Sequence, residues 1–150
     1  MQFMMTAGTD GFSSGAMGAA AARVQVLLVE DNPINQVVAL EFLSLMGLRS
    51  RLASNGLEAV DACMQAAPDL VLMDIQMPGM DGLECARRLR ELQARSELPH
   101  FPILALTAHA LESDVKASLA AGMDEHLTKP LDFTALRGRL DHWLGRLPAQ

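Results

Sequence analysis

Several apolar segments of this chain end in a polar residue whose side chain could take part in chemistry. Four such segments lead, in chain order, into Glu30 and Asp31, Asp74, Thr107 and Lys129. Short apolar runs of this kind are typical of buried strands. In a parallel sheet the carboxyl ends of the strands lie along one edge, which is where open α/β folds bind ligands. The sequence therefore predicts that these side chains gather at one edge of a sheet.

The types of these side chains favour phosphoryl chemistry supported by a divalent cation. Carboxylates that lie a few ångströms apart repel, and each raises the pKa of the others unless a cation lies between them. A few carboxylates, completed by water and phosphate, suit Mg²⁺ better than zinc or copper. Lys129 offers a compact charge that can pair with a carboxylate or a phosphate oxygen, and Thr107 offers a hydroxyl donor. This combination fits a carboxylate nucleophile, Asp74, that accepts a phosphoryl group.

Each residue also has a simpler interpretation. Glu30 and Asp31 could be partners for the dipole of the helix that follows them. Lys129 could be an exposed loop charge, and Thr107 an ordinary strand residue. Asp74 is harder to explain in this way, because four apolar residues precede it. Complementary chemistry at the ends of four separate segments favours a site over a merely solvated surface.

The segments that must position these residues alternate between strands and helices. Strands are expected at 24–29, 49–53, 70–73, 103–106 and 125–128. Helices are expected to begin near Asn32-Pro33, Asn55, Asp81, Leu111 and Asp132, and to end near Gly47, Pro68, Ala94, Gly122 and Leu144. Five strand–helix pairs in this order predict an α/β fold whose parallel sheet is covered on both faces.

Helical spacing of apolar residues predicts which face of each helix packs on the sheet. The expected inward residues are Ile34, Val37, Val38, Phe42 and Leu45; Leu57, Val60 and Met64; Leu83, Ala86 and Leu89; Leu111, Val115 and Leu119; and Leu136, Leu140 and Leu144.

Composition limits the class of protein. A chain of 150 residues with 50% hydrophobic content supports one core. A net charge of −6 argues against a nucleic-acid surface, and the arginines at 87–95 alternate with acids as on a solvated helix face. Cys63 and Cys85 have neither metal-like nor disulfide-like spacing, which indicates reduced thiols in a cytoplasmic protein.

The ends of the chain differ from its middle. Residues 1–22 are rich in Met, Gly, Ala and Ser and have no periodicity, which predicts a flexible leader or linker. The domain is expected to span residues 23–146, followed by a tail at 147–150. The apolar stretches are shorter than the roughly 20 residues that a membrane-spanning helix needs, so we expect no membrane contact by this domain.

In its ordered set of motifs the sequence resembles the receiver domain of two-component response regulators over residues 24–144. The motifs are Val29-Glu30-Asp31-Asn32, Leu72-Met73-Asp74, Met77-Pro78-Gly79-Met80-Asp81-Gly82, Ala105-Leu106-Thr107-Ala108 and Thr128-Lys129-Pro130. Asn35-Gln36 after the first motif, and the segment 105–110, look most like receivers of hybrid sensor histidine kinases. The resemblance implies a doubly wound, flavodoxin-like (βα)5 domain with strand order 2-1-3-4-5.

The resemblance also implies roles for individual residues. Asp74 would accept a phosphoryl group from a phosphohistidine of a histidine kinase phosphodonor domain, and a histidine phosphotransfer protein is a further expected partner. Mg²⁺, or Mn²⁺ in its place, would be bound by Asp31 and Asp74, by Glu30 largely through water, and by the backbone carbonyl of Gln76. Lys129 would pair with the phosphoryl group, and its bond to Pro130 would be cis.

Further positions relate to switching and to the lifetime of the phosphoryl group. Thr107 would move toward the phosphoryl group, and the small Ala108 would leave room for the donor. Gln76 and His109 would border the attacking water. His126 stands where the family commonly has Tyr or Phe, a departure that puts the usual aromatic switch in doubt. The output surface would be the fourth helix, the last strand and the fifth helix.

Other functions compete with a phosphorelay receiver. A haloacid-dehalogenase-like phosphatase also uses a strand-end aspartate with Mg²⁺, but places a second acid two residues later, where this chain has Gln76. A receiver-like binding module that is never phosphorylated usually lacks one of the acids or the lysine. The chain could be a stand-alone response regulator, or the C-terminal receiver of a hybrid histidine kinase, which the motifs favour. On its own it is not expected to be a conventional enzyme.

Overall fold

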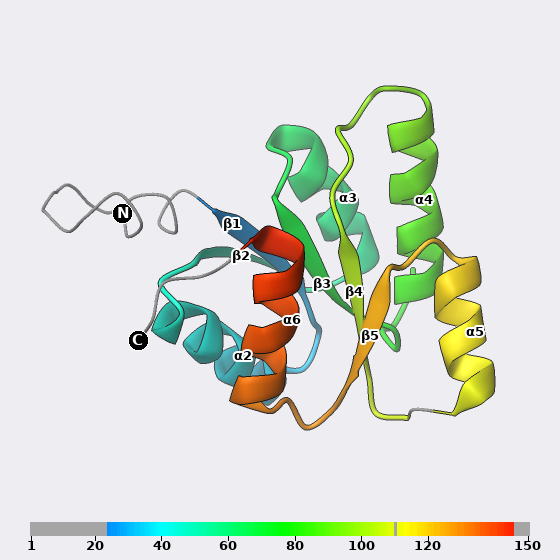
Figure 1. Cartoon of the computed structure of the whole chain (residues 1–150). Coiled ribbons are helices and arrows are strands. Elements are labelled where there is room, and N and C mark those ends of the chain that lie inside the picture. Colours follow the sequence, from blue (N-terminus) through cyan, green and yellow to red (C-terminus); the bar gives the residue numbers. More distant parts are fainter. Residues whose placement is uncertain (1–23, 110, 146–150) are drawn as a thin grey trace, which may run out of the picture.

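The computed structural model describes residues 24–109 and 111–145 (Figure 1). The predictions for the leader at 1–22 and the tail at 147–150 lie outside these residues. The elements are β1 (Gln25–Val29), α2 (Pro33–Leu45), β2 (Arg49–Ala53), α3 (Gly56–Gln65), β3 (Leu70–Asp74), α4 (Gly82–Ala94), β4 (Ile103–Thr107), α5 (Glu112–Ala120), β5 (Glu125–Thr128) and α6 (Phe133–Leu144). No helix within the described residues is both long and apolar enough to cross a bilayer.

The strands form one parallel sheet in the order β2-β1-β3-β4-β5, so the predicted fold class and strand order are confirmed. α2 and α6 cover one face of the sheet, and α3, α4 and α5 lie on the other (Figure 1). The strand order reverses between β1 and β3, and such a reversal opens a crevice at the carboxyl ends of the two strands.

Alternation along the central strands divides the core into two layers. Leu27 and Val71 point toward α3 and α4, whereas Leu28 and Leu72 point toward α2 and α6. All four side chains are fully buried. Burial of each of these side chains contributes about 1.5–3 kcal/mol to the stability of the fold relative to an exposed side chain. The two central strands are therefore a rigid support for the residues that follow their carboxyl ends.

Helix boundaries follow the predicted capping residues. The Asn32 side chain accepts hydrogen bonds from the amides of Ile34 and Asn35 at 2.9 and 3.0 Å, and Pro33 occupies the first turn. Gly47 ends α2 with a φ of +76°, a left-handed conformation that favours glycine. Asp81, Asp132 and Asn55 likewise accept hydrogen bonds from the first turns of α4, α6 and α3.

The inward faces of α4 and α6 are largely as predicted. Ala86 and Leu89 of α4 are fully buried, and so are Leu136 and Leu140 of α6. In both helices the larger apolar residues recur on one side only, so the helical spacing of apolar residues indicates a single inward face.

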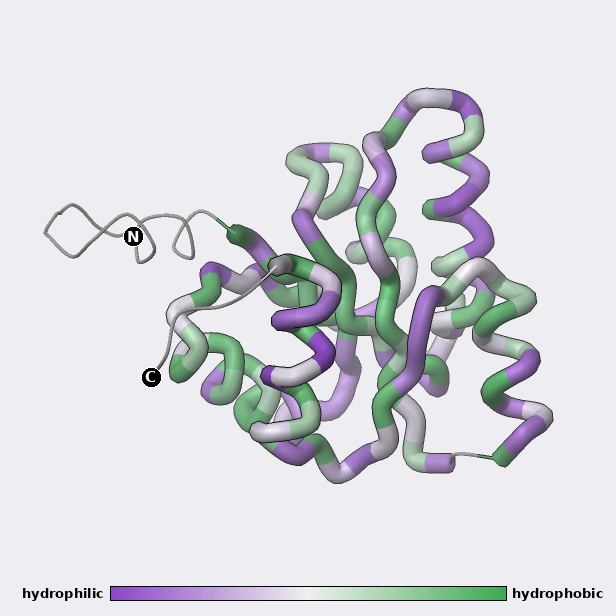
Figure 2. Tube along the Cα trace, in the orientation of Figure 1, coloured by the Kyte–Doolittle hydropathy of each residue, from purple (hydrophilic) through white to green (hydrophobic). Residues whose placement is uncertain are grey.

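The predicted inward face of α2 is wrong except at Phe42, which is half-buried against the core. Ala39 and Leu43 are buried against the sheet, whereas Ile34 and Val37 are 73% and 68% exposed. α2 is largely hydrophobic in Figure 2, so the period alone does not single out one stripe. The small side chain of Ala39 lets the helix backbone approach a sheet face that is already filled by leucines.

The predicted inward faces of α3 and α5 are also wrong, except at Val60, which packs against the core, and Val115, which is half-buried. The buried residues of α3 are Gly56, Ala59 and Cys63, while the predicted Leu57 and Met64 are exposed. In α5 only Ser118 is buried among the helix residues, while Leu119 and the N-cap residue Leu111 are exposed. Small residues again face the core, and the larger apolar ones face outward.

Both cysteines are buried, free thiols in the core between the sheet and the α3–α4 layer. Burial raises the pKa of Cys63 to about 11, and burial together with the nearby Cys63 raises the pKa of Cys85 to about 12. Thiols with such pKa values are protonated and unreactive at neutral pH. The prediction of reduced thiols that face the core is confirmed.

Candidate functional site

The crevice between β1 and β3 brings three carboxylates together. Val29 pairs with Met73 in the sheet, so the residues that follow and end these strands lie side by side. One carboxylate oxygen from each of Glu30, Asp31 and Asp74 lies within 4.8 Å of the other two. Glu30 is 1% exposed and Asp74 is 4% exposed, while Asp31 is more accessible. Two largely desolvated acids and one accessible acid therefore face a common point.

Lys129 places its ammonium group between two of these acids. Its Nζ atom lies 3.0 Å from Glu30 Oε1 and 3.1 Å from Asp74 Oδ2. The residue follows β5, and its amide donates a 2.7 Å hydrogen bond to the Thr107 carbonyl, which fixes its backbone at the same edge of the sheet. The Lys129–Pro130 peptide bond is cis, as expected.

Glu30 is held in its ionised form. Burial raises the pKa of its carboxyl, but the Asn32 amide, which donates to Oε2 at 3.1 Å, and the Lys129 ammonium outweigh burial and lower the pKa overall. The Glu30 carbonyl accepts a 2.7 Å hydrogen bond from the Gln36 side chain. The backbone and the carboxylate of this residue are thus both fixed.

Asp74 has the opposite balance. Burial and the neighbouring Glu30 raise its pKa to about 6, and Lys129 only partly offsets them. The hydrogen bonds to the two acids raise the pKa of Lys129, although its own burial lowers it. One ammonium cannot neutralise three carboxylates, so the site keeps an excess of negative charge that a divalent cation would relieve.

The acids line an open cavity of about 200 Å³ together with residues from four loops and from α2. The lining residues are Glu30, Asp31, Asn32, Asn35, Asp74, Gln76, Ala108 and Lys129. The Gln76 amide donates a 3.1 Å hydrogen bond to Asp74 Oδ1, which holds the start of the β3–α4 loop against the carboxylate. Hard oxygen donors around a polar, accessible cavity fit Mg²⁺.

Three of the residues predicted from the sequence lie in other surroundings. The Thr107 hydroxyl donates to the His109 carbonyl at 2.8 Å and accepts from the His109 amide at 3.1 Å, so it is engaged within its own loop. The His109 side chain is exposed. His126 is half-buried on β5, where it pairs with Ala105 of β4. The switching role of Thr107 and His126 and the tuning role of His109 stay predictions.

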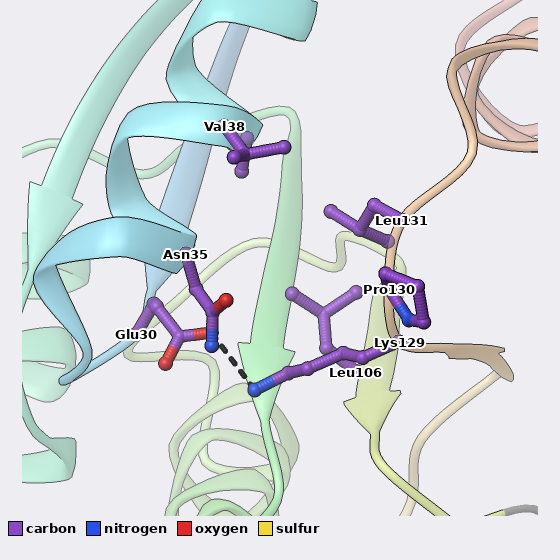
Figure 3. Close-up of a pocket in the computed structure, with 8 residues that line it drawn as sticks. Glu30, Asn35, Val38, Leu106, Lys129, Pro130 and Leu131 are labelled. Carbon is purple, nitrogen blue, oxygen red and sulfur yellow. Dashed lines mark ion pairs between the residues drawn. The ribbon is translucent and has the colours of Figure 1, made fainter.

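A second, smaller cavity of about 80 Å³ adjoins the first (Figure 3). Its walls are mostly apolar and include Val38 of α2, Leu106 of β4 and Leu131 after β5. Lys129 crosses this cavity with its ammonium group directed at Glu30 (Figure 3). Asn35 lines both cavities; the sequence reasoning gave neither Asn35 nor Gln36 a role, although both lie within two helical turns of Glu30.

Comparison with known proteins identifies the family. Residues 26–141 match the response regulator receiver domain. The chain belongs to the receiver domain family. Receiver domains act in two-component phosphorelay signal transduction, and the strand-end acids and lysine described above lie within the matched segment.

The receiver's sequence relatives include sensor kinases. It is 41% identical to the sensor protein GacS of Pseudomonas syringae pv. syringae over 121 residues, which cover 81% of this chain and 13% of GacS. It is 36% identical to hybrid signal transduction histidine kinase K of Dictyostelium discoideum over 122 residues, which cover 79% of this chain and 10% of that protein. The receiver therefore spans a small part of the length of these relatives.

Solved receiver structures resemble this one closely. The receiver domain of the sensor histidine kinase PA1611 from Pseudomonas aeruginosa PAO1, with a magnesium ion coordinated in its active site cleft, has a TM-score of 0.74 and 39% identity, covering 83% of this chain and 99% of that one. The Saccharomyces cerevisiae Ssk1 receiver domain, solved with the histidine phosphotransfer protein Ypd1, has a TM-score of 0.76 and 32% identity, covering 81% and 89%.

Proposed function

We propose that this receiver accepts a phosphoryl group from a phosphohistidine onto Asp74 in a Mg²⁺-dependent reaction. The observation that carries the proposal is the placement of Lys129 Nζ 3.1 Å from Asp74 Oδ2, beside three carboxylates within 4.8 Å of one another. In the transfer, an Asp74 oxygen forms a bond to phosphorus while the nitrogen–phosphorus bond of the donor breaks. The electron pair of that bond returns to the donor imidazole.

The residues of the site divide the work between them. Asp31, Asp74, Glu30 through water, and the Gln76 carbonyl would hold Mg²⁺, with Mn²⁺ as a substitute. When bound, the cation supplies neutralisation of charge on the transferring oxygens. At neutral pH the Asp74 carboxyl, with its pKa of about 6, is mostly ionised and so available as a nucleophile. Lys129 is already desolvated and aimed at Asp74, and it exchanges part of that contact for a phosphoryl oxygen.

Phosphorylation would be read out through the loop that follows β4. The phosphoryl group adds about −1.5 to −2 charges at Asp74. The Thr107 hydroxyl then leaves the His109 backbone and donates to the phosphoryl group, because a charged acceptor makes the stronger hydrogen bond. The loop and α5 follow, and the surface of α5, β5 and α6 changes shape. His126 on β5 would respond to this movement, and Gln76 and His109 would border the water that hydrolyses the phosphoryl group.

The partner protein that carries the phosphohistidine would need an apolar surface that matches one on this receiver. Ile34, Val37 and Val38 form an exposed apolar patch on α2, and Val38 also lines the small cavity next to Lys129. A histidine kinase phosphodonor domain or a histidine phosphotransfer protein that covers this patch would bring its histidine to the open side of the acidic cavity. The complex of the similar Ssk1 receiver with Ypd1 supports a phosphotransfer protein as one such partner.

The sequence relatives support a hybrid sensor histidine kinase as the parent protein, with this receiver as one of its domains. A stand-alone response regulator is the alternative. The two differ in one measurable respect, because the gene of a hybrid kinase also encodes a kinase domain in the same reading frame.

Incubation with acetyl phosphate and Mg²⁺ tests the proposal directly. The native chain should gain one phosphoryl group by mass spectrometry, and EDTA should prevent the gain. Asp74→Asn should abolish it, whereas Asp61→Asn, which changes an exposed acid on α3, should leave it intact. Labelling that persists in Asp74→Asn would exclude Asp74 as the acceptor.

A further inference from the structure

Two glycines near the acidic cavity have a role that turn geometry does not explain. Gly82 begins α4 and Gly56 begins α3, and both are buried. Neither has a positive φ, so an alanine could adopt the backbone conformation of either residue. What distinguishes the two positions is the space around the missing side chain.

Gly82 lies directly against the end of β3. Its amide donates a 2.9 Å hydrogen bond to the Ile75 carbonyl. A Cβ atom at this position would collide with the Asp74 carbonyl oxygen and would lie 2.8 Å from Ile75 Cα. All the close atoms belong to the backbone, so the collision could be relieved only by moving the start of α4 away from the strand that ends in Asp74.

Gly56 lies against the loop between β3 and α4, at Met80. A Cβ atom at Gly56 would lie 2.7 Å from the Met80 carbonyl oxygen and 2.9 Å from Met80 Cγ. The Gly56 carbonyl also accepts a 3.5 Å hydrogen bond from the Cys85 thiol of α4. The loop between β3 and α4 is therefore enclosed by the first residues of two helices that contact each other.

We propose that Gly82 and Gly56 are positioning residues for the cation and phosphoryl site. The enclosed loop carries Gln76, whose amide binds Asp74 Oδ1 and whose carbonyl is the expected backbone ligand. A side chain at either glycine would displace this loop and shift the Gln76 carbonyl relative to the Asp31 and Asp74 carboxylates. This inference rests on the proposed function, since it concerns the geometry of the same site.

Gly82→Ala and Gly56→Ala test the proposal, with Gly138→Ala as the matched control. Gly138 lies within α6, where a Cβ atom would meet nothing within 4 Å, and alanine is the better helix former. Mg²⁺ binding by titration calorimetry should weaken by about 10-fold to 100-fold in the first two variants, as for other losses of support around metal ligands, and should not change in the control. Phosphoryl transfer from acetyl phosphate at saturating Mg²⁺ should recover toward the native rate.

A loss of stability alone would not produce this pattern, because binding is measured at a temperature where each variant is folded by circular dichroism. The Gln76 amide resonance supplies a second signature, since its bond to Asp74 should be altered in Gly82→Ala and retained in Gly138→Ala. If Gly82→Ala does not fold, Gly56→Ala decides, because only one of its three close contacts, the Met80 carbonyl oxygen, belongs to the backbone. Folded variants that bind Mg²⁺ as tightly as the native chain overturn the proposal. A native chain that binds no Mg²⁺ overturns the proposed function instead.

Discussion

α4 and α5 lie next to each other on one face of the sheet, and they are anchored very differently. α4 buries Cys85, Ala86, Leu89 and Leu92 and is capped by the Asp81 side chain. α5 is shorter, has no side-chain hydrogen bond at its N-cap residue, Leu111, and buries only Ser118. The helix that closes on the cation-binding loop is fixed, whereas the helix that follows Thr107 is held weakly. We therefore expect α4 to stay in place and α5 to move more readily.

The weak helix is nevertheless tied down at one end. Arg90 of α4 donates to the Gly122 carbonyl at 2.8 Å and to Asp124 Oδ2 at 2.7 Å, and also to the Phe101 carbonyl at 2.8 Å. The ion pair between Arg90 and Asp124 is mostly shielded from solvent. These contacts hold the turn after α5, so any movement of α5 should be largest at its N-terminus, which is the end next to Thr107.

The largest expected difference between the two helices is in packing. Leu89→Ala should lower the free energy of unfolding by about 2–5 kcal/mol, because it opens a cavity in a fully buried position. Leu119→Ala on the exposed side of α5 should change it by less than about 0.5 kcal/mol. Urea unfolding measures both. Equal losses in the two variants would mean that α5 is packed as firmly as α4.

Removal of the Arg90 contacts should have the next largest effect. Arg90→Ala removes a donor from the part-buried Gly122 and Phe101 carbonyls and from Asp124, which keeps the 2.8 Å hydrogen bond from the Ile103 amide, and this should cost about 1–3 kcal/mol. Arg95→Ala, which breaks only exposed ion pairs, should cost less than about 1 kcal/mol. In Arg90→Ala, hydrogen exchange should become faster at the C-terminal end of α5. Unchanged exchange there would show that this turn is held by other contacts.

At the N-terminus of α5, a substitution should stabilise the helix, in contrast to the two destabilising changes above. Leu111 has the extended backbone of an N-cap residue, so Leu111→Asp can supply the missing acceptor and should stabilise α5 by about 0.5–1 kcal/mol. Asp81→Ala should destabilise α4 by about 1 kcal/mol, since it removes the bond to the Glu84 amide. Hydrogen exchange of the first-turn amides should slow in the first variant and accelerate in the second. Slower exchange in both would refute this account of the caps.

The smallest expected effect concerns pH and lies at β5, the strand beside α5. Burial raises the pKa of Glu125, but the hydrogen bonds from Trp143 at 2.6 Å and Arg139 at 2.7 Å outweigh it and lower the pKa overall. Because the pKa of Glu125 is lower in the folded state than in the unfolded state, its ionised carboxylate stabilises the fold. This stabilisation is fully present when the pH is above the unfolded-state pKa of about 4.3, and it is lost as the pH falls through the folded-state pKa.

Glu125→Gln should therefore cost less than about 1 kcal/mol at pH 7 and nothing at low pH. Urea unfolding followed by Trp143 fluorescence at several pH values checks this. A cost that is the same at pH 7 and at pH 3 would assign the effect to packing rather than to charge.

The sequence was sufficient to predict the edge of the site but not the packing of every helix. Glu30, Asp74 and Lys129 could be placed together because apolar runs mark buried strands and a parallel topology aligns their ends. The outward orientation of Ile34 and Val37 could not be predicted, because α2 is apolar on more than one side and the size of Ala39 decides which side approaches the sheet.

Two further features could not be predicted from the pattern of apolar residues. The Thr107 hydroxyl could have faced Asp74, and only the course of the following loop directs it to the His109 backbone. Gly82 looks like part of an ordinary turn before a helix, and its proximity to the Asp74 carbonyl becomes visible only when β3 and α4 are in place.

The sharing of Lys129 between Glu30 and Asp74 also affects the stability of the domain when it is not phosphorylated. Burial and the neighbouring Glu30 raise the pKa of Asp74, so its ionised carboxylate lowers the stability of the fold at neutral pH, and a cation that binds the folded site must raise that stability by mass action. Resistance to proteolysis should therefore rise and fall with free Mg²⁺, so that the carboxylates proposed to take part in phosphoryl transfer would also make the lifetime of the domain depend on magnesium.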